Sequence, residues 1–155
     1  MIEGVQTKAL KAICDERGRL MEILRSDDPM FAGFGQVYLT TTYPGVVKAW
    51  HLHRRQTDVI CCIRGDIQLV LHDPRGASPT RGEVDELAIG EGNPLLVSIP
   101  PGVHHGWKCV SPDEAFVINV PDQPYRREQP DEYRLPPDSG EVPYRWVLTP
   151  GLKHG

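Results

Sequence analysis

Residues 45–65 read GVVKAWHLHRRQTDVICCIRG, and this stretch decides the fold class. Over residues 59–64 the side chains alternate in a two-residue period, and the alternation resumes over residues 67–72. A period of two predicts β-strands. Gly65, between the two runs, can adopt the positive φ that a tight turn requires. We therefore expect a β-hairpin over residues 59–72.

Further short segments of strand character follow one another along the chain, each bounded by Gly, Pro, Asp or Ser. They cover residues 4–13, 19–25, 35–42, 45–53, 84–89, 94–99, 105–110 and 114–120. One helical turn is expected over residues 27–33, where Ser26 and Asp27 can cap it. The 15 Gly and 15 Pro residues leave little room for longer helices. The sequence predicts an all-β barrel or sandwich of about ten short strands.

The chain of 155 residues has the length of one domain, with its core expected over residues 4–120. Seven prolines fall within residues 121–155, and apolar positions are few there. We expect this segment to be an extended Pro-rich tail that packs over the barrel or over a second subunit. Residues 1–155 thus form a single domain.

Charge and composition exclude several classes of protein. The net charge is −4 and no run of Lys or Arg exceeds two residues, so a nucleic-acid partner is not expected. No apolar stretch approaches the roughly 18 residues of a membrane span. The N-terminus lacks the pattern of a signal peptide, and the four cysteines form no C-x-x-C pair. A soluble, cytoplasmic protein with reduced thiols is expected.

Five of the six histidines lie between residues 51 and 105. His51 and His53 are two positions apart at the end of a strand pattern, so both side chains face one side of the sheet. With Gly45, Asp58 and Gly65 they resemble the first motif of the cupin superfamily. Residues 100–105, PPGVHH, resemble the second, which is P-x-G-x-x-H. This resemblance implies a cupin-type double-stranded β-helix, a jelly-roll barrel.

A closer resemblance extends from about residue 15 to residue 146. Four motifs in the same order are similar to those of the dTDP-4-dehydrorhamnose 3,5-epimerase family of cupin enzymes. They are DERGRLME at 15–22, GVVKAWH at 45–51, HDPR with SPT at 72–80, and IPPGVHHGW at 99–107.

The resemblance implies proton transfer beside the C4 keto group of a nucleotide-linked sugar, with no cofactor required. His51 stands in the position of the base, and imidazole has a pKa suited to that role. Lys48 stands where the family has an oxyanion-binding Arg, and preorganised positive charge stabilises the enolate. Asp58 and His105 are expected to be orienting or proton-shuttle groups.

The chain departs from the family at several of these positions. Asp58 replaces a Lys that binds the oxyanion, and an Asp there is expected to repel an enolate. His53 replaces a Gln. The family's acid Tyr maps onto Ile118 or Asn119, neither of which is a plausible acid. The Asp that orients the base has no clear counterpart after Trp146.

Two interpretations of these changes stay open. His51, His53, Asp58 and His105 are the ligand types of a metal-binding cupin, and a divalent ion could replace the lost Lys. In the favoured alternative Asp58 forms a hydrogen bond with His51 or His53 and orients it, and no metal is bound. Asp58→Asn would then preserve the fold and move the acidic limb of the pH–rate profile to lower pH.

The resemblance also implies residues that bind the substrate. They are Arg17, Glu22, Gln36, His53, Arg75 and Tyr125, of which Arg17 or Arg75 would contact the diphosphate and Tyr125 the nucleobase. The predicted function is an epimerase or isomerase of a nucleotide-linked 4-keto-6-deoxy sugar for polysaccharide or glycoconjugate synthesis. The alternatives are a metal-dependent cupin enzyme and a non-catalytic sugar-binding cupin. A homodimer is expected, since family members exchange N-terminal strands.

Overall fold

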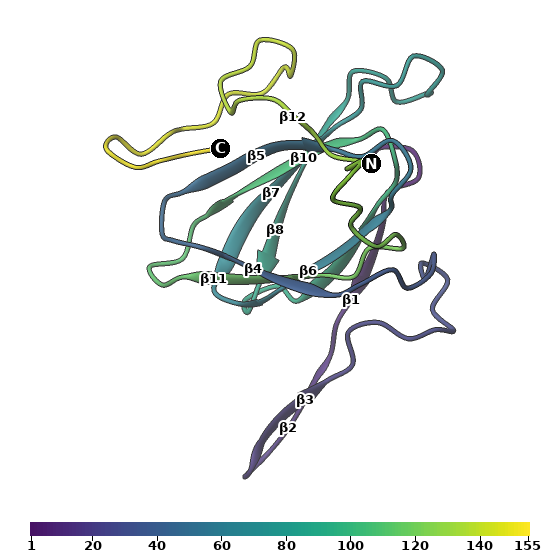
Figure 1. Cartoon of the computed structure of the whole chain (residues 1–155). Helices are drawn as coiled ribbons and strands as arrows, with labels where there is room; N and C mark the ends of the chain where they lie inside the picture. The colour runs from purple at the N-terminus through teal and green to yellow at the C-terminus, as the bar shows by residue number, and fades with distance from the viewer.

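The computed structural model describes residues 1–155 and contains twelve β-strands and no helix (Figure 1). The strands are β1 (Gln6–Ala9), β2 (Ala12–Asp15), β3 (Gly18–Met21), β4 (Tyr38–Thr42), β5 (Val47–Leu52), β6 (Asp58–Arg64), β7 (Asp66–His72), β8 (Val84–Gly90), β9 (Leu95–Ile99), β10 (His104–Cys109), β11 (Ala115–Asn119) and β12 (Tyr133–Arg134).

Ten of these strands form two five-stranded antiparallel sheets that face each other. The strand orders are β1-β9-β6-β11-β4 and β12-β5-β10-β7-β8. Side chains from both inner faces meet in the main core, which includes Ile60, Val97 and Val117 from the first sheet and Ile67 and Leu69 from the second. The all-β cupin-type prediction is confirmed.

The β-hairpin predicted over residues 59–72 is wrong, although both of its strands exist. β6 pairs with β9 and β11, whereas β7 pairs with β10 and β8 in the other sheet, so the chain crosses from one sheet to the other at Gly65. This glycine has a φ of 69°, and a Cβ on it would lie 2.6 Å from Ser111 Oγ. Both the backbone conformation and the close approach therefore require glycine here.

Two predictions for the first 33 residues are wrong. The segment 4–13 is not one strand, because Leu10 lies between β1 and β2, where its N–H donates to the Pro94 carbonyl. Residues 27–33 form turns without a helix. Asp28, in that segment, accepts hydrogen bonds from Lys8 Nζ and the Arg25 N–H. The segment is thereby held to β1 and to its own preceding turn.

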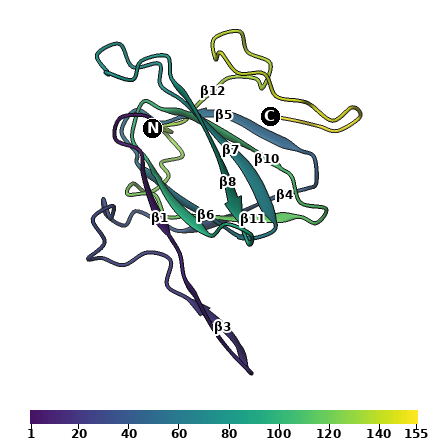
Figure 2. The same ribbon diagram turned by 180° about the vertical axis from the view of Figure 1, so that it is seen from behind.

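The β2–β3 hairpin projects away from the barrel (Figures 1 and 2). Ile13 and Leu20 are paired across it and are 61% and 59% exposed. Leu39 on β4, the last strand of its sheet, is also exposed. Apolar side chains therefore lie bare on the hairpin and on an open sheet edge.

Residues 121–155 return across the barrel and contain only β12. Trp146 and Tyr144 pack against the buried Trp50 of β5, with ring centroids 5.3 and 6.0 Å away. Together with Val142 they form a second core on the outer face of the β5 sheet. This part of the tail therefore packs on the barrel of its own chain.

Candidate active site

A cavity of about 640 Å³ opens between the two sheets. Its walls come from β4, β6 and β11 of one sheet, from β5 and β10 of the other, and from the tail. The polar residues that line it include Gln36, Tyr38, Lys48, His51, His53, Arg55, Gln56, Asp58, His105, Asn119, Tyr125, Arg126, Asp131, Glu132 and Arg134. Most of the residues predicted for the site are thus gathered in one place.

A β-bulge places Lys48 and His51 on the same face of β5. The two residues are three positions apart, so strict alternation would point them to opposite faces. Opposite them, His105 pairs with His51 and Trp107 with Lys48, which sets three steps on β5 against two on β10. The extra residue on β5 turns both side chains into the cavity.

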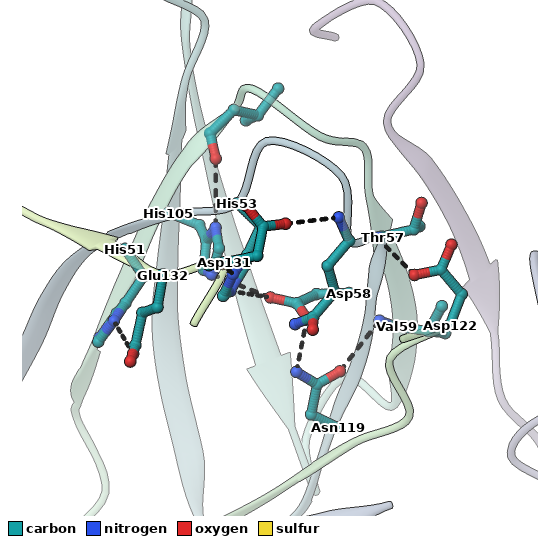
Figure 3. A network of polar contacts seen from close by, with 12 residues as sticks. His51, His53, Thr57, Asp58, Val59, His105, Asn119, Asp122, Asp131 and Glu132 are labelled. Carbon is teal, nitrogen blue, oxygen red and sulfur yellow. Dashed lines mark hydrogen bonds and ion pairs between the residues drawn. The ribbon is translucent and has the colours of Figure 1, made fainter. Parts of the chain in front are cut away.

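His51 is oriented by Glu132, which belongs to the tail (Figure 3). Its Nδ1 lies 3.4 Å from Glu132 Oε1. A carboxylate accepts, so Nδ1 carries the proton and the lone pair of Nε2 is left for the substrate. Burial lowers the pKa of His51, although the hydrogen bond that His51 donates to Glu132 opposes this. His51 is therefore neutral at pH 7, as a general base must be.

His53 and His105 converge on Asp58 (Figure 3). The Nε2 atom of each ring lies 3.2 Å from Asp58 Oδ2. The Nδ1 atoms face backbone carbonyls, that of Asp131 for His53 and that of Val103, at 3.2 Å, for His105. Each ring therefore has an oxygen acceptor at both of its nitrogens.

The charge of Asp58 is neutralised where it lies. Burial disfavours the carboxylate, but hydrogen bonds from His105 and His53 outweigh burial and hold its pKa well below the usual range. Gln56 Nε2 and Asn119 Nδ2 also donate to Oδ1, at 2.7 and 2.9 Å. From the sequence we expected this carboxylate to repel an enolate. In the structure its two oxygens instead accept hydrogen bonds from four donors.

The same contacts determine the charge of His53. Burial disfavours its cation, but the hydrogen bond and charge of Asp58, with help from Asp131, raise its pKa to about 9. His53 is thus an imidazolium at neutral pH. Of the two partners that the sequence left open for Asp58, the structure selects His53 and adds His105, whereas His51 pairs with Glu132.

His53, Asp58 and His105 are also the residues that could hold a metal ion. Their ligand atoms lie within 4.8 Å of one another. Two ligands about 2.0–2.2 Å from one tetrahedral ion are roughly 3.2–3.6 Å apart, which is near the 3.2 Å separations here. His51 is not part of this cluster, so the four-ligand set of the metal alternative reduces to three.

Lys48 supplies positive charge to the cavity wall beside His51. Its Nζ donates to the Thr41 carbonyl at 2.8 Å. Burial and the nearby charge of Arg134 lower its pKa. An ammonium held by one carbonyl still has donors for a developing oxyanion.

The predicted substrate-binding residues divide into two groups. Gln36, His53 and Tyr125 line the cavity. Arg17 and Glu22 lie on or after the projecting hairpin, where Arg17 pairs with Asp15. Arg75 is bound by Asp73 at 2.8 Å and by the Glu3 carbonyl, and it does not reach the cavity of its own chain.

Sequence reasoning missed several residues of the site. Glu132 is the orienting carboxylate, Asp131 accepts from the N–H groups of residues 54–56, and Asn119 bridges β11 to Asp58. Arg55 and Arg126 add positive charge to the lining. The one available signal was the acidic pair 131–132 within a Pro-rich segment, and such pairs are common on protein surfaces.

Two further observations bear on the class of protein. All four cysteines are free, and three of them are buried. No helix in the structure is long and apolar enough to cross a membrane.

Comparison with known proteins identifies the family. The sequence profile described as dTDP-4-dehydrorhamnose 3,5-epimerase matches residues 1–152. The spore coat polysaccharide biosynthesis protein SpsL of Bacillus subtilis is 39% identical over 146 residues, which cover 94% of this chain and 97% of that protein. The "Probable low-salt glycan biosynthesis epimerase Agl13" of Haloferax volcanii is 40% identical over 152 residues, 94% of each chain.

A solved structure agrees with these sequence relationships. The dTDP sugar isomerase of Desulfovibrio desulfuricans G20 superimposes with a TM-score of 0.89 at 35% identity, over 94% of this chain and 92% of that one. The profile match spans nearly the whole chain, and the relatives are similar in length. The chain belongs to the dTDP-4-dehydrorhamnose 3,5-epimerase family.

Proposed function

We propose that this protein is an epimerase that inverts a carbon next to the keto group of a nucleotide-linked 4-keto-6-deoxy sugar. Enzymes of this family are isomerases that need no cofactor. The relatives named for spore coat polysaccharide and glycan biosynthesis support a role in polysaccharide or glycoconjugate synthesis. The observation that carries the proposal is a neutral His51, oriented by Glu132, in a cavity that is also lined by cationic side chains.

The first chemical step is the removal of a proton. Nε2 of His51 takes the proton from the carbon beside the carbonyl, the C–H pair forms a C=C bond, and the C4 oxygen becomes an oxyanion. Lys48 and the His53 imidazolium are the cations on that side of the cavity. A preorganised donor is worth roughly 3–4 kcal/mol at a developing oxyanion.

The nucleotide diphosphate is proposed to lie along the tail wall. Arg55 and Arg126 line the cavity and form no ion pair with a carboxylate of the chain, whereas Arg134 pairs with Glu132 at 2.8 Å. Guanidinium groups match the geometry of phosphate oxygens. Tyr125 lies beside Arg126 and presents an aromatic face for the base.

A homodimer is part of the proposal. The β2–β3 hairpin is too small to be stable on its own, and its apolar pair Ile13 and Leu20 is bare. A second subunit that covers the hairpin would bury these side chains and would bring Arg17 and Glu22 near a partner's surface. The free thiols support a cytoplasmic location.

The convergence of His53 and His105 on Asp58 favours one second candidate, a metal-dependent cupin enzyme. A single experiment separates it from the proposal and from a non-catalytic sugar-binding cupin. The purified protein, analysed for metal, is incubated in D2O with a dTDP-4-keto-6-deoxyhexose, and proton NMR follows each ring carbon. Exchange and a new epimer in metal-free protein support the proposal. Binding without exchange supports the sugar-binding alternative.

A further inference from the structure

We propose that Tyr38 is the acid that protonates the enolate on the face opposite His51. This inference rests on the proposed function and deepens it. Inversion needs a proton donor on the far side of the ring, since a base that returns its own proton restores the original configuration. The family's tyrosine position on β11 is occupied here by Ile118 or Asn119, so another donor must act.

Tyr38 lies directly beside the position on β11 where the family carries its tyrosine. It is the register partner of Asn119, across the antiparallel pair of β4 and β11. Gln36, Tyr38 and Thr40 alternate along one face of the segment, and all three line the cavity. Tyr38 is 41% exposed, so a ligand in the cavity can reach it. A phenol thus occupies the strand next to the one that carries it in the family.

The hydrogen bonds of Tyr38 leave its proton free. Asn119 Nδ2 donates to the phenol oxygen at 2.8 Å, and no protein atom accepts the Tyr38 O–H. The amide is fixed in this orientation, because its Oδ1 accepts from the Val59 N–H at 3.1 Å and its Nδ2 also donates to Asp58. Asn119 therefore supplies the donor that a phenolate would need after proton transfer.

Tyr38 and His51 belong to opposite walls of the cavity. Tyr38 is on the sheet β1-β9-β6-β11-β4, and His51 is on the sheet β12-β5-β10-β7-β8. A pyranose ring that lies between the sheets presents one face to each residue. This is the arrangement that removal of a proton from one face and delivery to the other requires.

The protonation step balances without any further reactant. The C=C pair of the enolate takes the proton from Tyr38, the O–H bond breaks, and the C4 carbonyl re-forms. Tyr38 is left as a phenolate beside Asn119, and His51 is left protonated. One proton that returns through solvent resets both groups.

The surroundings of Tyr38 keep it protonated until that step. Burial and the charge of Asp58 raise its pKa to about 12, although the Asn119 hydrogen bond opposes the rise. The acid form is thus the resting form at neutral pH. The phenol of Tyr43 is 69% exposed and does not line the cavity, so it serves as a matched control.

The test compares Tyr38→Phe, Tyr43→Phe and the wild-type protein in D2O with a dTDP-4-keto-6-deoxyhexose. For Tyr38→Phe we expect formation of the epimer to fall by at least about 100-fold. We expect the recovered substrate to gain deuterium with its configuration unchanged, since His51 still acts. Tyr43→Phe should invert at a rate within a few fold of the wild type. Binding of dTDP and thermal unfolding serve as controls for the fold.

Two outcomes with Tyr38→Phe would overturn the assignment while leaving the proposed function intact. One is inversion at the wild-type rate. The other is an equal loss of exchange and inversion with dTDP binding preserved, which would place Tyr38 in the enolisation step instead. A wild-type protein that exchanges no ring proton would overturn the proposed function itself, and this inference with it.

Discussion

His51 on β5 and Glu132 on the tail form a dyad, with Nδ1 and Oε1 3.4 Å apart. The strand supplies the base, and the tail supplies the carboxylate that selects its tautomer. The hydrogen bond to His51 is also the main reason that the pKa of Glu132 falls to about 2, so the carboxylate is charged at every pH of interest. The dyad forms only when the tail is packed.

His51→Ala should abolish deuterium wash-in from solvent at the carbons that flank the keto group. The variant removes the imidazole that Glu132 orients. NMR of the sugar in D2O measures the exchange, and dTDP affinity serves as the control for an intact site. Full wash-in by the variant would refute the assignment of the base.

Glu132→Gln should lower kcat by roughly 10²–10⁴-fold, the usual contribution of a positioned base. Because the carboxylate raises the pKa of His51, its loss should also move the acidic limb of the kcat profile to lower pH. Glu128→Gln, on the exposed part of the tail, is the matched control. A profile for Glu132→Gln that coincides with the wild type would contradict the role of the dyad.

Asp58→Asn should destabilise the fold by about 3–5 kcal/mol, since it leaves the buried His105 and the partly buried His53 without their carboxylate. This differs from the sequence-based expectation of a preserved fold, because the carboxylate proves to be buried among four donors. Urea unfolding of this variant and of Asp122→Asn, whose carboxylate caps Thr57 N–H, gives the comparison. Equal midpoints would count against it.

The pH dependence of the free energy of unfolding follows from the ion pair of His53 and Asp58. The pKa of His53 is raised from 6.5 to about 9, so its contribution is complete below pH 6.5 and is lost as the pH rises to 9. The pKa of Asp58 is lowered, so its contribution is complete above 3.8. The wild type should therefore lose stability between pH 6.5 and 9. Asp58→Asn should lose this slope, and an unchanged slope would contradict the pairing.

The protein purified without chelator should contain far less than one equivalent of metal, and EDTA should leave its activity unchanged. The physical reason is that protons on His53 and His105 can satisfy Asp58 without an ion. Elemental analysis after dialysis measures the content. An ion that is retained by the wild type and lost from Asp58→Asn would show that His53, Asp58 and His105 bind a metal, and would favour the metal-dependent enzyme.

The protein should be dimeric at micromolar concentration by light scattering. Leu20→Glu, which places a charge on the bare hairpin, should shift the mass toward the monomer. Val147→Glu, at a residue of the tail that is 79% exposed, should not. A monomeric wild-type protein would oppose the proposed role of the hairpin.

The local features of the fold could be predicted because they depend on neighbours in sequence. The period of two predicted the strands on either side of Gly65 and the common face of His51 and His53, but not that the two strands belong to different sheets. The break at Leu10 could not be predicted, since it depends on the carbonyl of Pro94, far along the chain. Strand propensity alone continues through that point.

The same distinction explains what was missed in the site. Glu132 reaches His51 because the tail folds back on β5, and a Pro-rich segment has no periodicity from which its path could be read. Tyr38 was overlooked because its proposed role depends on its pairing with Asn119 in the adjacent strand β11. Sequence motifs identify residues within a strand, whereas pairing between strands decides which of them meet.

The bulge on β5 has a consequence for protein engineering. The spacing of Lys48 and His51 brings both side chains into the cavity only when β5 pairs with residues 105–107 of β10. There, two residue steps on β10 match three on β5. Grafting residues 47–53 into another jelly roll would aim either the lysine or the histidine outward unless that portion of β10 travelled with them. The transferable unit is therefore a pair of strand segments.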